Sequence, residues 1–264
     1  ASPCQGEGRE FESRHPLHSP AQVLPGAGVT LLRMTTCASD LIGPVLDSAE
    51  CETRAAMVMT IFGAFGRRGT SAVLGNDLDS QLLHALRSWA DVVLVSAGTV
   101  TAEAYGSVDT PIAILSRSLN IKPNSGVLKG RDAIIVCPES SLLDVTLNNK
   151  RVALERAGAR FVAAGEGTAA EIVDALHREG FRRIACEGGP SVYADMIADN
   201  QIDVLHITLD PTVSDADGPW GMGNLAQQPP FEDRYTLEAT HASDLEADSG
   251  DSVLFLRYRS VRER

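Results

Sequence analysis

The feature that most constrains the fold is a pair of glycines between an apolar run and a helical pattern. Residues 186–191 read Cys-Glu-Gly-Gly-Pro-Ser. The apolar run 181–185, interrupted only by two arginines, precedes them, and apolar residues at helical spacing follow from Val192. A strand, a tight turn and a helix in this order form the repeating unit of α/β proteins. Paired glycines let a phosphate approach the backbone, and the amides at a helix N-terminus point at it. The segment therefore indicates an anion site, although a tight turn without a ligand has the same composition.

A second strand and loop, earlier in the chain, have the composition of a ligand-binding edge. Residues 92–95 are continuously apolar, as in a strand covered on both faces, and Ser-Ala-Gly-Thr follows at 96–99. Glu103 comes next, so a carboxylate follows a loop of small residues that a ligand can approach closely. An amphipathic helix is predicted upstream, because apolar residues recur at every fourth position, at Leu78, Leu82, Leu86 and Ala90.

Apolar runs and helical patterns alternate along the chain. Helices are predicted over 142–157, over 168–180, where a capping box runs from Thr168 to Glu171, and from Val192. Strands are predicted over 57–62, 92–95, 112–115, 133–137, 160–164, 181–185 and 204–209, and an antiparallel pair over 235–242 and 252–258. This order predicts an α/β fold with a mostly parallel central sheet, flanked by helices, and a C-terminal antiparallel hairpin.

The composition fits one domain of a protein that binds a small molecule. Residues 1–27 are polar and rich in proline, so we expect a disordered N-terminal extension, followed by a single domain over 28–264. A net charge of -12 argues against a nucleic-acid partner, and no apolar stretch approaches the ~20 residues of a membrane span. The five cysteines contain no Cys-Xaa-Xaa-Cys pair, which suggests free thiols in a reducing, cytoplasmic compartment. No metal site is predicted, because the six histidines show no ligand spacing and the Pro-Cys-Xaa-Xaa-Cys of zinc deaminases is absent.

Taken together, the two strand-and-loop segments resemble the reductase domain of bacterial riboflavin biosynthesis. The resemblance covers roughly residues 56–259 and rests on Gly69-Thr70-Ser71, Leu86-Arg87, Ala90-Asp91, Gly98-Thr99-Val100, Glu103 and Glu187 to Pro190. It implies a dihydrofolate-reductase-like fold, NADPH as cofactor and a homodimer. It also implies reduction of the ribosyl side chain of a phosphorylated aminopyrimidine to the ribityl form.

The resemblance also implies roles for individual residues. Glu187 and Glu103 would be the catalytic acids, and Ser71, Arg87 and Glu187 would bind the substrate. The cofactor would contact Thr99, Glu103, Ser116, Arg117, Gly188, Gly189, Pro190, Ser191, Val192 and Tyr193. Ser116 and Arg117 follow a predicted strand, where a hydroxyl and a guanidinium suit the 2′-phosphate of NADP. The alternatives are a solvated loop acid for Glu187, a turn-stabilising hydroxyl for Thr99, a helix-start acid for Glu103 and a helix-surface charge for Arg87. His84 and His206 are interpreted as core or surface histidines.

The chain departs from the family pattern at two places. The first strand of the family ends in Ser-Leu-Asp-Gly, whereas this chain has Thr60-Ile61-Phe62-Gly63 and lacks the acid. After a later strand, Val213-Ser214-Asp215 replaces the usual glycine pair. Two alternatives therefore stay open: a reductase of another pterin- or pyrimidine-like substrate, and a cofactor-binding protein without activity.

Overall fold

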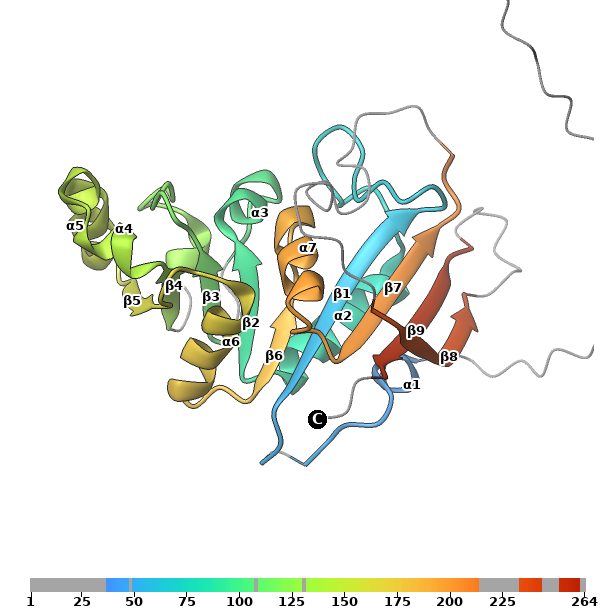
Figure 1. Ribbon diagram of the computed structural model, residues 1–264. Helices are drawn as coiled ribbons and strands as arrows, with labels where there is room; N and C mark the ends of the chain where they lie inside the picture. The colour runs from blue at the N-terminus through green and yellow to red at the C-terminus, as the bar shows by residue number, and fades with distance from the viewer. Residues whose placement is uncertain are drawn as a thin grey trace, which may run out of the picture. The chain divides into compact units, whose positions relative to one another are not determined.

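The predicted strands assemble into one sheet covered by helices in the computed structural model of the chain (Figure 1). The structure describes residues 37–47, 49–106, 109–129, 132–213, 233–243 and 252–261. The predicted extension, residues 1–27, and the predicted start of the domain at residue 28 lie outside these ranges, as do Ser214 and Asp215. Within the described ranges, no helix has the length and apolar character needed to cross a bilayer.

The described strands are hydrogen-bonded in the order β5-β4-β3-β2-β6-β1-β7-β9-β8. Parallel pairs join β1 (Glu52–Thr60), β2 (Val92–Ser96), β3 (Ile112–Leu115), β4 (Ala133–Cys137), β5 (Arg160–Ala163), β6 (Arg183–Cys186) and β7 (Val204–Asp210). Antiparallel pairs join β9 (Leu254–Ser260) to β7 and to β8 (Tyr235–Ala242). The predicted fold class, a mostly parallel sheet that ends in an antiparallel hairpin, is therefore confirmed.

Helices cover both faces of the sheet, which explains the continuous apolar run of β2. Val92 and Leu94 belong to a core cluster with residues of α6 and α7, whereas Val93 and Val95 belong to a cluster with residues of α3 and α5. A third cluster joins α1 and α2 to Ala185 of β6. The helices are α1 (Ala38–Ile42), α2 (Asp77–Trp89), α3 (Ala97–Ala102), α4 (Glu139–Leu143), α5 (Asn148–Arg156), α6 (Ala169–Arg178) and α7 (Pro190–Ala198).

Strand β1 begins at Glu52, five positions before the start predicted at Met57. Charged residues in its first half hide the apolar pattern, yet they are buried because they neutralise one another. The carboxylate of Glu52 accepts hydrogen bonds from Arg54 Nε at 2.8 Å and from Arg259 Nη1 at 2.8 Å, and the Arg54 guanidinium lies 4.6 Å from the centre of the Trp89 ring. Buried charges are tolerated when they are paired in this way.

The predicted helix over 142–157 is wrong as a single element. It consists of the end of α4, a 3-10 turn at Val145–Leu147 and α5. Asp144 explains the break, because its Oδ1 accepts hydrogen bonds from both the backbone amide and the hydroxyl of Thr146. A short polar side chain that binds the following backbone in this way competes with the helical hydrogen bonds.

Candidate active site

Two strand-to-helix turns meet at the carboxyl edge of the sheet. Strands β2 and β6 are neighbours, and their helices α3 and α7 pack on opposite faces of the sheet. The turns are tied together where the Ser96 amide donates to the Gly188 carbonyl at 2.7 Å. In open α/β sheets, a crevice forms where neighbouring strands send their connections to opposite faces, and ligands bind there. The topology therefore places a ligand site at the two segments that the sequence singled out.

A cavity of about 740 Å³ lies at this edge. Its wall is made by both turns, by β1, β7 and α2, and by the loop between β1 and α2. This volume is within the range of cofactor and small-molecule sites. Of the residues predicted for the site, nine line the cavity: Ser71, Arg87, Thr99, Glu103, Glu187, Gly189, Pro190, Ser191 and Tyr193.

The Gly188-Gly189 turn leaves no room for a side chain. Gly188 has φ +68°, and a Cβ atom added there would lie 2.3 Å from the Tyr193 ring. A Cβ added to Gly189 would lie 2.7 Å from Thr99 Oγ1. Gly189 is also the N-cap of α7, whose first helical residue is Pro190. Gly189, Pro190 and Ser191 line the cavity, and amides of a first helical turn attract anions.

The turn between β2 and α3 provides hydroxyl groups beside the glycines. Ser96 Oγ accepts a hydrogen bond from the Thr99 amide at 3.0 Å and lies 2.9 Å from Thr99 Oγ1. This places the Thr99 hydroxyl between the two turns. The predicted turn-stabilising role of Thr99 and the predicted cofactor contact are therefore compatible.

Arg87 and Glu187 form an ion pair in the cavity wall. Arg87 Nε and Nη2 donate to the two carboxylate oxygens of Glu187, each at 2.7 Å, and Nη2 also donates to the Tyr105 hydroxyl at 2.5 Å. The Glu187 side chain is 6% exposed, so it is not a solvated loop acid. Burial raises the pKa of Glu187, and Arg87 opposes that shift. Most of the Arg87 guanidinium is thus committed to Glu187 and Tyr105, and within the described part of the chain no hydrogen bond uses Nη1.

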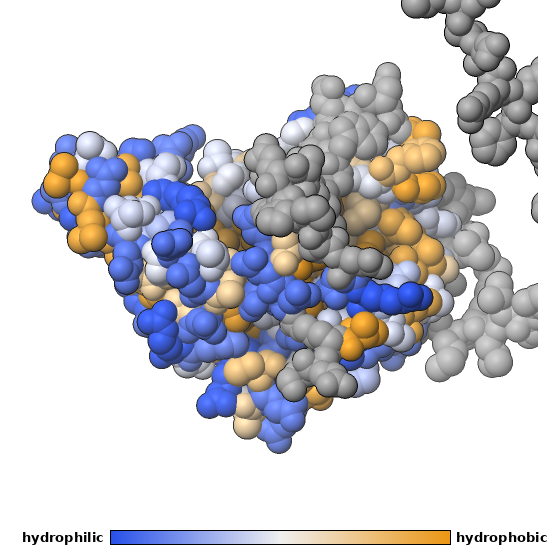
Figure 2. Space-filling model, in the orientation of Figure 1, coloured by the Kyte–Doolittle hydropathy of each residue, from blue (hydrophilic) through white to orange (hydrophobic). Residues whose placement is uncertain are grey.

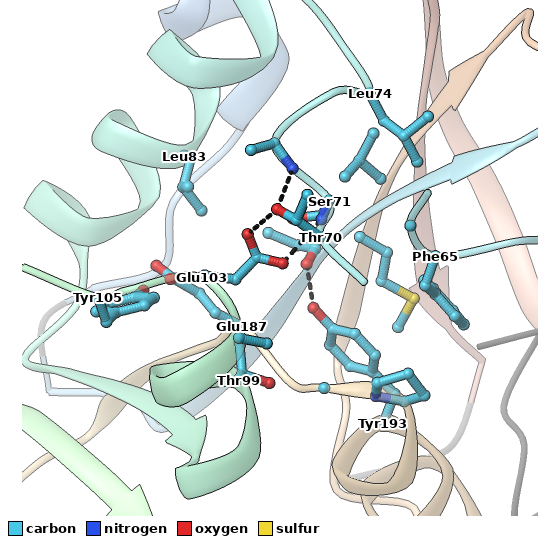
Figure 3. Close-up of a pocket in the computed structure, with 18 of the residues that line it drawn as sticks. Phe65, Thr70, Ser71, Leu74, Leu83, Thr99, Glu103, Tyr105, Glu187 and Tyr193 are labelled. Carbon is cyan, nitrogen blue, oxygen red and sulfur yellow. Dashed lines mark hydrogen bonds between the residues drawn. The ribbon is translucent and has the colours of Figure 1, made fainter. Parts of the chain in front are cut away.

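Glu103 is held by the loop that follows β1. Its carboxylate accepts hydrogen bonds from the Thr70 hydroxyl at 2.7 Å and from the Ser71 amide at 2.8 Å (Figure 3). It lies at the C-cap of α3, so the alternative of a helix-start acid is wrong. These bonds fix the loop against α3 and bring Ser71 to the cavity wall.

Four of the predicted cofactor residues do not line the cavity: Gly188, Val192, Ser116 and Arg117. Gly188 and Val192 are buried beneath the β6–α7 turn. Ser116 follows β3 at the same edge of the sheet and is buried, whereas Arg117 is exposed and donates to the carbonyls of Glu166 and Gly167 at 2.9 and 2.7 Å. Their contact with a cofactor stays a prediction.

Replacing Arg117 with alanine is expected to narrow the preference for NADPH over NADH by about 1–2 kcal/mol, the scale of one charge-assisted hydrogen bond. Calorimetric titration with both cofactors measures this difference. Arg178→Ala is the matched control, because it removes the same charge from an exposed arginine that, among the described residues, donates to Asp174 of its own helix. Equal affinity of the unaltered protein for both cofactors would contradict the placement of the 2′-phosphate at Arg117.

The position of the missing family acid lies outside the cavity wall. Ile61 and Phe62, directly after β1, are 54% and 68% exposed and do not line the cavity. Figure 2 shows apolar surface gathered where β1 ends in Figure 1. The loss of the acid therefore changes the surface after β1, whereas the described wall of the cavity is formed by other residues.

The sequence interpretation missed a polar group at the other end of the cavity. Asp79, His206 and Thr208 line it, and none of them was assigned a role. Thr208 Oγ1 donates to Asp79 Oδ1 at 2.6 Å. The available signal was the alternation in β7, where polar residues occupy every second position of a strand that is otherwise apolar.

Comparison with known proteins agrees with this geometry. The family described as the RibD C-terminal domain matches residues 54–244. No curated protein matches the chain. A pyrimidine reductase-like protein from Corynebacterium diphtheriae has a similar structure, with 25% identity and a TM-score of 0.74 over 86% of this chain and 100% of that one. RibD of Acinetobacter baumannii and the riboflavin biosynthesis reductase Rib7 of Saccharomyces cerevisiae share the fold. The A. baumannii protein has 15% identity and a TM-score of 0.61 over 81% of this chain and 59% of its own length. The S. cerevisiae protein has 15% identity and a TM-score of 0.57 over 83% of this chain and 94% of its own length.

Proposed function

The chain belongs to the RibD C-terminal domain family, and we propose that it is an NADPH-dependent reductase of the riboflavin-pathway type. The substrate would be a phosphorylated ribosylaminopyrimidine, whose ribosyl side chain is reduced to ribityl. The observation that carries this proposal is the meeting of the β2–α3 and β6–α7 turns at a cavity of about 740 Å³. A small-residue edge of this kind suits a dinucleotide, and the cavity beside it has room for a second small molecule.

The residues at the two turns fit the cofactor. Gly189 and Thr99 line the cavity side by side, since a Cβ atom on Gly189 would lie 2.7 Å from Thr99 Oγ1. Gly189 and Ser191 would offer the open backbone at the start of α7 to the pyrophosphate, and Thr99 would add a hydroxyl. NADPH supplies the hydride when bound, and the protein contributes position and charge.

The substrate would lie on the α2 side of the cavity. Glu187, held by the Arg87 fork, would contact the sugar and fix its orientation. Ser71 and Arg87 Nη1 would hold the phosphate. In the proposed reaction, C1 of the opened imine would accept a hydride and the imine nitrogen would take up one proton from the solvent, so that the ribityl amine and NADP⁺ would result.

Glu103 would act differently from Glu187. Both of its carboxylate oxygens are used by Thr70 and Ser71, so its contribution would be to position the loop that bears Ser71. We therefore propose Glu187 as the acid that contacts the substrate and Glu103 as a positioning residue. The resemblance further implies a homodimer, and the free thiol of Cys37 suits a cytoplasmic protein.

A reductase of another pterin- or pyrimidine-like molecule is the second candidate. The exposed Phe62 in place of the family acid favours it, because the substrate would meet different groups. The third candidate is a protein that binds the cofactor but catalyses no reaction.

Steady-state oxidation of NADPH, followed by absorbance, tests these proposals. We expect turnover with the ribosylaminopyrimidine phosphate and none with its ring or its sugar phosphate alone. Turnover with a dihydropterin only would favour the second candidate. NADPH binding without oxidation by any member of the panel would favour the third and would overturn the proposed reaction.

A further inference from the structure

A row of buried polar side chains follows β7 on one face of the sheet. His206, Thr208 and Asp210 occupy alternate positions and are 2%, 1% and 7% exposed. Alternate residues of a strand point to the same face. This face is the one covered by α2, because Thr208 contacts Asp79 of that helix. A strand buried beneath a helix normally presents apolar side chains, so three polar ones in succession require an explanation.

Asp79 presents a carboxyl group to the cavity. Its Oδ1 accepts the Thr208 hydroxyl proton, and no donor among the described residues binds its Oδ2. The loop before α2 packs closely on this carboxyl group, since a Cβ atom on Gly75 would lie 2.8 Å from Oδ2. Asp210 holds that loop in place by accepting a hydrogen bond from the Gly75 amide at 2.9 Å.

His206 adds a second polar group without a partner. Its Nε2 is buried and has no hydrogen bond within the described part of the chain, although the side chain lines the cavity. Burial lowers the pKa of His206 to about 3, and Arg54, Arg257 and Arg259 add to this effect, so the imidazole is neutral. Leaving such a group unsatisfied is unfavourable, and a ligand that binds it removes this cost.

We propose that Asp79, Thr208 and His206 bind the ring of the substrate, a nitrogen heterocycle that carries N–H and C=O groups on one edge. This inference rests on the proposed function and names the part of the substrate that the residues recognise. Thr208 uses its proton on Asp79, so the Thr208 oxygen and the Asp79 carboxylate are both acceptors for ring N–H groups. The neutral imidazole of His206 can pair with a ring carbonyl or nitrogen.

This arrangement supplies a carboxylate that the end of β1 lacks. Phe62 offers no acid there, whereas Asp79 enters the cavity from α2. Burial and then the negative charge of Asp210 raise the pKa of Asp79, as is common for carboxyls that serve a ligand in a site of low dielectric. Asp79 and the Arg87–Glu187 pair both line the cavity, so one molecule can present its ring to Asp79 and its sugar to Glu187.

A purely structural role for Asp79 is the competing explanation. Asp79 lies in the first turn of α2, where an acid is favoured by the helix dipole, and its bond to Thr208 joins α2 to β7. Such a role predicts a loss of stability on substitution without a selective loss of ring binding. The two explanations therefore differ in a binding measurement.

The test uses two halves of the proposed substrate as probes, with NADPH present at saturation. The ring probe is 5,6-diaminouracil, and the sugar probe is ribose 5-phosphate. We expect Asp79→Asn to weaken binding of the ring probe by about 10–100-fold, the effect of removing one charge-assisted acceptor, and to leave the affinities for ribose 5-phosphate and NADPH unchanged. Asp77→Asn is the matched control, since it changes the same charge at an exposed position of the same helix turn.

Thr208→Val provides a second variant in case Asp79→Asn does not fold. It keeps the shape of the side chain, and we expect a loss of ring-probe affinity of about 3–10-fold. Equal ring-probe affinity in the unaltered protein and both variants would overturn the inference, and so would a failure of the unaltered protein to bind that probe. Selective loss in the variants would support the inference even if the unaltered protein oxidised no NADPH, an outcome that would overturn only the proposed reaction.

Discussion

Replacing Gly189 with valine is expected to weaken NADPH binding by at least about 100-fold, or about 2.8 kcal/mol. A side chain at this position enters the space that we assign to the pyrophosphate and covers the amides at the start of α7. Its Cβ atom alone would lie 2.7 Å from Thr99 Oγ1. Calorimetry with NADPH measures the loss, and thermal unfolding shows whether the protein is still folded.

A double-mutant cycle separates the two ways in which this substitution acts. NADPH affinity is measured for Gly189→Ala, for Thr99→Ala and for the variant that carries both substitutions. The double variant removes the collision with the threonine hydroxyl but keeps the methyl group at the start of α7. If the glycine matters because the cofactor needs its space, affinity stays low in the double variant. Recovery to the affinity of Thr99→Ala would show that the turn is only structural.

Replacing Glu187 with glutamine is expected to lower turnover by about 10²–10³-fold, as typical for the loss of one positioned polar group that acts in the transition state. The amide keeps the shape of the side chain but removes the charge that pairs with both Nε and Nη2 of Arg87. NADPH affinity should be unchanged, because the Glu187 carboxylate is paired with Arg87 and is not one of the groups that we assign to the cofactor. Steady-state kinetics and NADPH titration together measure the two effects.

Glu179→Gln is the matched control for this variant. Glu179 accepts a hydrogen bond from Arg160 at 2.6 Å on the surface, so the same chemical change breaks an exposed ion pair far from the assigned chemistry. Exposed pairs contribute little, and we expect no change in turnover. Undiminished turnover in Glu187→Gln would remove Glu187 from the reaction, and Asp79 would then be the cavity acid to test.

The positions of the central strands could be predicted because their signal is local. The continuous apolar runs of β2, β3 and β4 reflect burial on both faces, and their predicted bounds agree with the structure to within one residue. The start of β1 was missed because its charged residues neutralise partners elsewhere, such as Arg259, which the periodicity does not reveal. The break before α5 depends on the hydrogen bonds of Asp144, which compete with the helix that the apolar pattern favours.

The sequence by itself determined the two turns at the candidate site, because turn chemistry is a property of adjacent residues. Small residues after an apolar strand, and paired glycines before a helix, indicate an open backbone wherever they occur. They therefore indicated the side of the cavity that we propose for the cofactor, and the family to which the chain belongs.

Only the tertiary structure decided how the polar side chains are used. Arg87 is committed to a glutamate 100 positions away, Glu103 to a loop about thirty positions before it, and Asp79 to a threonine 129 positions away. Such pairs form where the parallel sheet and α2 bring distant segments together, and no local periodicity encodes them. The tertiary structure was therefore needed to predict the hydrogen bonds of Glu103, the pairing of Arg87 with Glu187 and the position of Asp79 in the cavity wall.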